Sequence, residues 1–167
     1  MHPLAQMHDI TKMEFSRSLV GLSDEDARKR IEPMNCIGWI IGHVSLQQHL
    51  LFVAWANGKG MEPQYDAFDW GRPSSEPSLE EVAALWRASC DDADVWFEAA
   101  TEDSMLQTFP GAVKLGENAG TLVARNIFHT WCHLGEISAI RQILGHRSPE
   151  FVDMHGWPYT GQAIPGC

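Results

Sequence analysis

The sequence lacks the cysteine spacing of a disulfide-rich or thiolate-bound zinc protein. Its four cysteines, Cys36, Cys90, Cys132 and Cys167, are scattered, and no two of them form a C-x-x-C pair. This spacing argues against a disulfide framework and against a structural zinc site built from thiolates. The cysteines fit free thiols in a reducing compartment.

Basic residues are scarce as well. The chain has 12 Lys and Arg residues against 22 Asp and Glu residues, which gives a formal net charge of −10. It contains no Lys/Arg run, and an acidic surface repels the phosphate backbone of nucleic acids. We therefore expect no nucleic-acid partner.

Long uninterrupted apolar runs are also missing. No run approaches the ~20 residues that span a bilayer. The first residues, MHPLAQMHDITKMEF, show no basic stretch followed by an apolar core, the pattern of a secretion signal. We therefore expect no membrane partner and a cytoplasmic location.

What the sequence does contain is helical periodicity. Hydrophobic residues make up 44% of the 167 residues, which suits a single domain with a substantial core. Apolar residues recur at helical spacing in four segments, roughly 3 or 8 to 21, 36–57, 78–100 and 121–144. Asn35 is the expected cap of the second helix, and Ser78 with Glu81 forms a capping box for the third. Gly145 is the expected end of the fourth.

Four such helices predict an all-α fold, most simply a four-helix bundle. A helix of ~20 residues is ~30 Å long, whereas the connection 58–77 can extend ~60 Å. The second and third helices can therefore run parallel. We expect a short extended pair around 108–115. The whole chain, 1–167, is expected to form one domain with its core in 8–145 and an irregular, proline-containing tail in 146–167.

Three histidines carry the clearest chemical signal. His129 and His133 are four residues apart, so they lie on one helix face, and His43 lies on the apolar stripe of the second helix. Buried imidazoles need partners. Three of them around one cation form the three-nitrogen site with an open position that is typical of catalytic zinc. The alternative is three core histidines bonded to carbonyls, hydroxyls or water.

Several other residues are candidates for the same site. Glu136 follows His133 by three residues, and we consider it as a hydrogen-bond acceptor for a ligand imidazole, as a base near the metal, or as an ordinary surface glutamate. Candidates for pocket walls, against a plain core role, are Trp39, Asn126, Trp131 and Trp157. We expect one or both of the loops 58–77 and 101–120, with or without residues 157–159, to wall a pocket that opens onto the metal.

Some neighbouring residues are expected to stay outside the site. His49 competes as third ligand, but it lies about 120° from His43 around the helix, so we expect a histidine at the helix edge that is either hydrogen-bonded or solvated. Cys132 points about 100° away from His133 and is expected to be packed. His155 reaches the site only if the tail folds over the bundle.

Two segments resemble motifs of the DinB-like superfamily. Residues 35–44, NCIGWIIGHV, resemble its second-helix motif, in which a small-apolar-Trp-apolar run leads into a ligand histidine. Residues 129–137, HTWCHLGEI, resemble its fourth-helix motif, H-x-x-x-H-x-G-[QE]-[IL]. The resemblance covers roughly residues 8–145.

The resemblance implies an up-down-down-up four-helix bundle with a long crossover between helices 2 and 3, and a divalent metal held by His43, His129 and His133. Relatives include mycothiol-dependent maleylpyruvate isomerase and bacillithiol S-transferases. The resemblance therefore implies that this chain is a thiol-dependent S-transferase or isomerase, which uses a low-molecular-weight thiol and acts on a small-molecule substrate.

Other functions fit the same ligand set. Zinc is the expected metal, although imidazole also suits nickel and other transition metals. The alternatives to a thiol-dependent enzyme are a metal-dependent hydrolase that uses metal-bound hydroxide and a non-catalytic metal-binding stress-response module. If the chain associates with another copy, exposed apolar edges make a homodimer the expected assembly.

Overall fold

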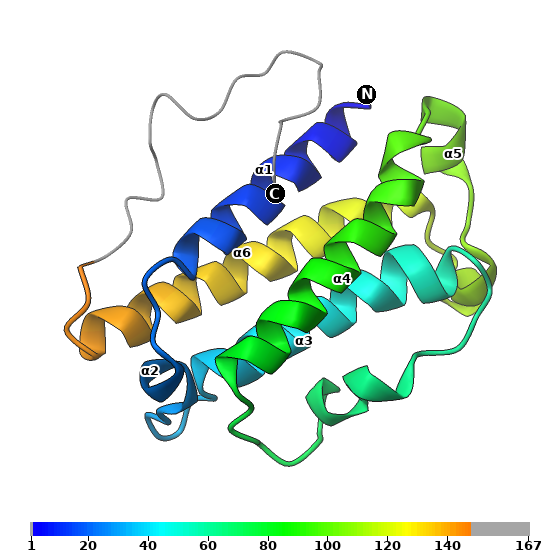
Figure 1. The fold of residues 1–167 in the computed structure, drawn as a ribbon. Coiled ribbons are helices and arrows are strands. Elements are labelled where there is room, and N and C mark those ends of the chain that lie inside the picture. The colour runs from blue at the N-terminus through cyan, green and yellow to red at the C-terminus, as the bar shows by residue number, and fades with distance from the viewer. Residues whose placement is uncertain (1, 148–167) are drawn as a thin grey trace.

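The computed structural model describes residues 2–147, and all regular elements in this range are helical, which confirms the expected all-α class (Figure 1). The α-helices are α1 (Pro3–Ser18), α2 (Asp24–Arg28), α3 (Ile37–His49), α4 (Leu79–Glu98), α5 (Glu102–Leu106) and α6 (Ala119–Ile143). A π-helix, η1 (Leu50–Trp55), and two 3₁₀ helices, η2 (Pro63–Phe68) and η3 (Pro110–Leu115), complete the set.

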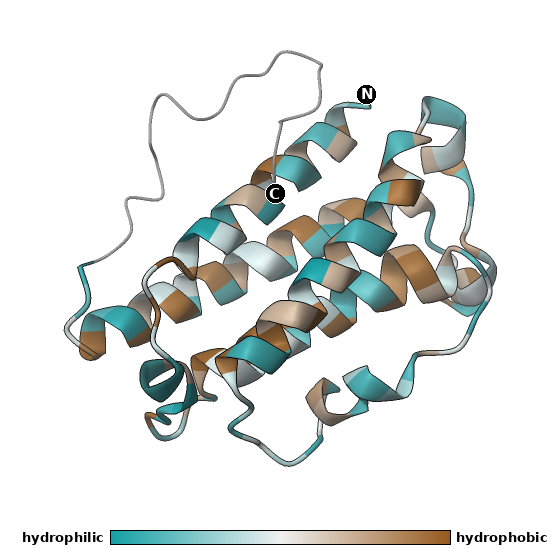
Figure 2. Cartoon of the chain, in the orientation of Figure 1, coloured by the Kyte–Doolittle hydropathy of each residue, from teal (hydrophilic) through white to brown (hydrophobic). Residues whose placement is uncertain are grey.

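The four long helices α1, α3, α4 and α6 pack against one another around the core. Helix α3 contacts α4 and α6, and α1 contacts α6 and α4. Figure 2 shows hydrophobic and hydrophilic residues alternating along these helices, as expected where one face meets a core. The core forms two clusters: one includes Phe15, Ile40, Trp86 and Ile137, and the other includes Ala5, Phe52, Phe97 and Leu122.

Helix starts follow local capping chemistry. The Ser78 hydroxyl accepts a hydrogen bond from the Glu81 backbone N–H at 3.3 Å, so the expected start of the third long helix is confirmed. The cap of α3 is Cys36, whose Sγ accepts from the Trp39 N–H at 3.4 Å. The expectation that Asn35 caps this helix was therefore wrong by one residue.

Helix α3 runs directly into the π-helix η1. The stretch Ile37–Trp55 is long and apolar enough to cross a bilayer, which corrects the expectation that no such run exists, but 83% of its apolar window is buried. That burial is the pattern of a core helix within residues 2–147. Wide π-turns recur near functional sites, and η1 follows His43 by two turns of helix.

The expected extended pair around 108–115 was wrong. Residues Pro110–Leu115 form η3, with Pro110 at the first helical position, where its missing N–H is no loss. Gly111 lies against η1, and a Cβ at this position would come within 2.7 Å of the Trp55 Cα atom. This close approach packs the loop 101–120 against η1, which continues the second long helix, α3.

The connection 58–77 contains η2, which packs on α3. The expectations for the tail concern residues mostly outside the described range. His155, Trp157 and the segment 157–159 all lie there, so their proposed places near the site stay predictions.

Candidate metal centre

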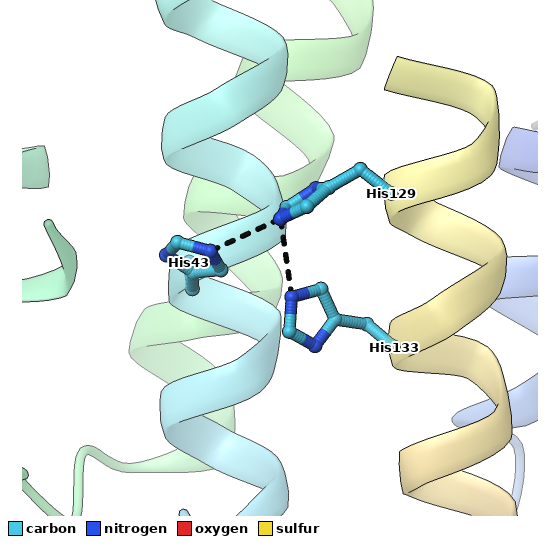
Figure 3. A group of neighbouring side chains, drawn as sticks. All are labelled: His43, His129 and His133. Atoms are coloured by element: carbon cyan, nitrogen blue, oxygen red, sulfur yellow. Dashed lines mark hydrogen bonds between the residues drawn. The ribbon is translucent and has the colours of Figure 1, made fainter. Parts of the chain in front are cut away.

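Three imidazoles meet between α3 and α6. Nε2 of His43, on α3, lies 3.2 Å from Nε2 of His129, on α6, and Nε2 of His133 lies 3.2 Å from the same atom. One ligand atom from each residue lies within 4.8 Å of the other two. Figure 3 shows the rings from the two helices turned toward one another. The expected convergence of the three histidines is thus present.

Hydrogen bonds on the outer side of two rings set their tautomers. Nδ1 of His43 donates to the main-chain carbonyl oxygen of Phe68 at 2.8 Å. Nδ1 of His133 donates to Oε2 of Glu136 at 2.7 Å. A neutral imidazole carries one N–H. The Nε2 atoms of His43 and His133 therefore both present lone pairs to His129.

This donor set fits a divalent cation. Without an ion, a neutral His129 ring could donate its single N–H to only one of the two facing lone pairs. The other lone pair would have no partner, whereas a cation satisfies both. Metal–nitrogen distances of 2.0–2.1 Å around a tetrahedral ion place ligand nitrogens about 3.4 Å apart. The observed spacing of 3.2 Å is close to that value. The three residues present can therefore hold one ion.

Burial keeps the cluster ready to bind a cation. Desolvation lowers the pKa of His43, and it lowers the pKa of His129 to about 4, with further lowering by the neighbouring His133 and His43. The hydrogen bond from His133 lowers the pKa of Glu136. Near neutral pH the pKa values of His43 and His129 keep these imidazoles neutral, and neutral imidazole is the form that binds metal.

Two neighbours fix the orientation of His43. The Trp39 ring stacks on it, with ring centroids 5.0 Å apart and planes 9° from parallel. Phe68 lies at the end of η2. It reaches His43 because the residue before His43 is Gly42, which has no side chain. A Cβ at Gly42 would lie 2.4 Å from the Phe68 ring. The sequence reasoning missed Phe68, and the small residue before the ligand histidine was the available signal.

The comparison with protein families agrees with this arrangement. The family model described as the DinB superfamily matches residues 7–137. The chain belongs to the DinB superfamily. The expected family is thereby confirmed. A comparison with curated proteins gave no match.

A pocket adjoins His129, one of the three converging histidines of this DinB protein. Its volume is about 310 Å³, and its lining consists of Gln47, Leu51, Trp55, Leu115, Leu122, Arg125, Asn126 and His129. The expected contribution from the loop 101–120 is present through Leu115. The lining contains no residue of the loop 58–77, which instead supplies the Phe68 carbonyl behind His43.

The pocket-wall candidates fall in different places. Asn126 lines this pocket, whereas Trp39 lies outside it and stacks on His43. Trp131 points to another helix, since its Nε1–H donates to the Thr11 hydroxyl of α1 at 3.0 Å. Trp131 does not line this pocket, because its side chain lies between α6 and α1, and its role as a pocket wall stays a prediction.

Two residues beside the ligands of the DinB site are not part of it. His49 is 1% exposed, stacks on Tyr65 with ring centroids 4.5 Å apart, and has Nε2 4.0 Å from Oε1 of Glu62. Cys132 is exposed, so the expectation that it packs was wrong. Within residues 2–147, the Cys132 side chain is therefore open to solvent and does not pack against another element.

Proposed function

We propose that this DinB protein is a metal-dependent enzyme in which His43, His129 and His133 hold one divalent ion, with zinc as the metal. The observation that carries the proposal is the meeting of three Nε2 atoms, two of them with lone pairs fixed by outer hydrogen bonds. We assign the four long helices to an up-down-down-up bundle, and the long connection between α3 and α4 supports that topology.

The reaction we propose is thiol-dependent S-transfer or isomerisation of a small molecule. The bound ion would supply Lewis acidity that favours the thiolate form of a low-molecular-weight thiol. In a transfer, the thiol releases its proton to solvent, its sulfur bonds to the electrophilic carbon, and the leaving group departs with the bonding electrons. In an isomerisation, the sulfur adds to a conjugated double bond and leaves again after rotation.

The protein's own groups have distinct parts in this proposal. Phe68 and Trp39 hold the His43 ring, and Glu136 holds the His133 ring and adds a negative charge next to the ligand set. We assign Glu136 to positioning. Its lowered pKa makes it a weak base near neutral pH, and this weakens the alternative of a hydrolase with Glu136 as general base.

We propose that a small molecule reaches one side of the site through the pocket beside His129. Apolar side chains form most of its lining, namely Leu51, Trp55, Leu115 and Leu122. A concave apolar pocket with a few polar groups is the usual form of a small-molecule site. It supports an enzyme over a non-catalytic metal-binding module.

The test begins with the metal content of the purified protein and a zinc titration of the metal-free protein. The proposal predicts one zinc per chain, lost in His129→Ala. A screen of low-molecular-weight thiols against small electrophiles then follows with the zinc-loaded protein. Turnover that needs both zinc and thiol supports the proposal. Turnover that needs zinc and water only identifies a hydrolase, and absence of zinc binding removes the proposal.

A further inference from the structure

Helix α6 presents an exposed stripe of mainly apolar and small residues on the side turned away from α1 and α3. The residues of this outer stripe recur every three or four positions, and all are exposed: Arg125, Phe128, Cys132, Gly135, Ala139 and Ile143. Phe128 is 70% exposed and Ile143 is 61% exposed. A spacing of three and four residues is the spacing by which one helix packs along another. Within residues 2–147 the outer stripe is open to solvent, so it is available to a helix from another molecule.

The charge distribution favours this face for contact with a second copy of the chain. The formal net charge is −10, so acidic surfaces of two copies repel each other. The exposed face of α4 is such a surface, because it holds Arg87 against five acidic residues, namely Glu80, Glu81, Asp91, Asp92 and Glu98. The exposed positions of α6 hold Arg125 and no acidic residue. Two copies can therefore approach through α6 without that repulsion.

Two charged residues at one edge of the outer stripe make it complementary to itself. Arg125 and Glu136 are eleven residues apart, so their side chains point within about 20° of each other around the helix. Arg125 directs Nε and Nη2 toward Glu117, and Glu136 accepts from His133 through Oε2. Nη1 of Arg125 and Oε1 of Glu136 have no partner within residues 2–147 and remain available for a contact between molecules.

The order of these charges selects the relative direction of two packed helices. In an antiparallel pair each edge of α6 meets the same edge of the other copy, so Arg125 meets the partner's Glu136. The two-fold axis then passes midway between positions 125 and 136, about 2 Å along the helix from Cys132. A parallel pair would instead place both Arg125 guanidinium groups at the same level. Flanking charges of this kind set the orientation of paired helices.

We propose that the outer stripe of α6 is the surface through which two copies of this chain associate, packed antiparallel about a two-fold axis near Cys132. The stripe is about 27 Å long and about 10 Å wide, so the contact covers about 300 Å² per copy. A stable interface buries about 800 Å² per partner. The dimer is therefore weak, with a dissociation constant of about 10 μM to 1 mM.

Sedimentation equilibrium of the full chain over a range of concentrations tests the association. Phe128→Glu should raise the dissociation constant at least about 10-fold, because it buries a charge at the centre of the contact. Val95→Glu is the matched control, since Val95 is 73% exposed on the acidic face of α4. It should leave the dissociation constant unchanged. A chain that stays monomeric up to about 1 mM overturns the proposal, and so does a dimer that survives Phe128→Glu.

Crosslinking tests the arrangement in a protein that carries Cys167→Ser. Cys132 is then the one exposed cysteine, because Cys36 and Cys90 are buried. A short bis-maleimide should join it to the partner's Cys132 at concentrations at which the dimer forms. Absence of this crosslink in a dimeric sample overturns the assignment to the outer stripe.

The direction of the helices is tested by moving the thiol to the start of α6. Thr121→Cys is placed in a protein that also carries Cys132→Ser and Cys167→Ser. In the antiparallel pair the two positions 121 are about 28 Å apart, beyond the reach of the reagent, so no crosslink should form. A crosslink at this position overturns the antiparallel arrangement.

This association goes beyond the proposed function and does not need it. None of the residues of the outer stripe is one of the three converging histidines. Zinc-free protein should therefore dimerise as zinc-loaded protein does, and both forms are measured by sedimentation. A dimer that forms only with zinc overturns the outer stripe as the interface, whereas a zinc-independent dimer supports it whether or not the metal proposal holds.

Discussion

The main-chain carbonyl of Phe68 accepts a hydrogen bond from Nδ1 of His43 at 2.8 Å, across 25 residues of sequence. A carbonyl is the partner here, so no substitution of the Phe68 side chain removes it directly. The contact instead depends on how closely η2 lies on α3. Gly42 permits that approach, because a Cβ there would meet the Phe68 ring at 2.4 Å.

The first prediction concerns this contact. Gly42→Ala should push η2 away from α3, destabilise the fold by about 1–3 kcal/mol as overpacking does, and weaken zinc binding about 10- to 100-fold through loss of the partner of His43. Chemical denaturation and a zinc competition titration measure the two effects. Gly135→Ala is the matched control, since nothing lies within 4 Å of the added Cβ. It should bind zinc normally and gain about 0.5–1 kcal/mol of stability.

The second prediction separates the ligands from the nearby His49. His129→Ala and His133→Ala should each lose tight zinc binding. His49→Ala should keep it while the fold loses about 0.5–3 kcal/mol, because this buried ring stacks on Tyr65. Zinc titration and thermal melts of the three variants provide the measurement. Comparable zinc loss in His49→Ala would show that the third ligand was wrongly chosen.

The third prediction concerns Glu136, whose Oε2 accepts from Nδ1 of His133 at 2.7 Å. Glu136→Gln keeps the shape but removes the charge, and we expect zinc affinity to fall about 10- to 100-fold. Glu98→Gln makes the same charge change at an exposed position of α4 and should leave the affinity unchanged. Equal affinity in both variants would remove the positioning role of Glu136.

The fourth prediction is the pH dependence of the metal-free protein. The pKa of His129 is lowered to about 4, against about 6.5 in an unfolded chain. Between these values the unfolded state binds more protons, so the free energy of unfolding decreases as the pH falls from 6.5 toward 4. The lowered pKa of His43 acts in the same direction. Urea denaturation at pH 7 and pH 5 measures the slope, and His129→Phe should reduce it.

The same low pKa values affect the zinc-loaded protein. Protons compete for a ligand imidazole only as the pH approaches its folded-state pKa, which for His129 is about 4. The increase in melting temperature on adding zinc should therefore persist at pH 6 and decline below pH 5. A gain that disappears already at pH 6.5 would contradict the lowered pKa values of His43 and His129.

The convergence of the three histidines could be predicted because two regular patterns coincide in the sequence. The spacing of His129 and His133 and the apolar stripe around His43 both follow from helix geometry. The carbonyl behind His43 could not be predicted in this way. Every residue has a carbonyl, and which one reaches the ring depends on the path of the loop 58–77.

Residue preferences and helix periodicity gave wrong expectations at two positions, Asn35 and Cys132. Asn35 is the better N-cap by preference, yet Cys36 takes the role, which places its Sγ 3.4 Å from the Trp39 N–H. Cys132 was expected to be packed, and it is exposed. Periodicity gives the side of a helix on which a residue lies, and burial depends on whether another element covers that side. Trp131 shows the same limit, since its partner Thr11 is on α1.

The π-helix η1 begins at Leu50, after the part of α3 that carries His43, and it supplies Leu51 and Trp55 to the pocket. The stretch that holds the ligand and the stretch that shapes the pocket are therefore consecutive but separate. Exchanges at Leu51 or Trp55 can remodel what the cavity admits without moving the imidazole donors. Under the proposed function, the π-helix separates two tasks: the same three histidines can serve differently shaped cavities, and a change in the bound molecule need not alter the coordination of the ion.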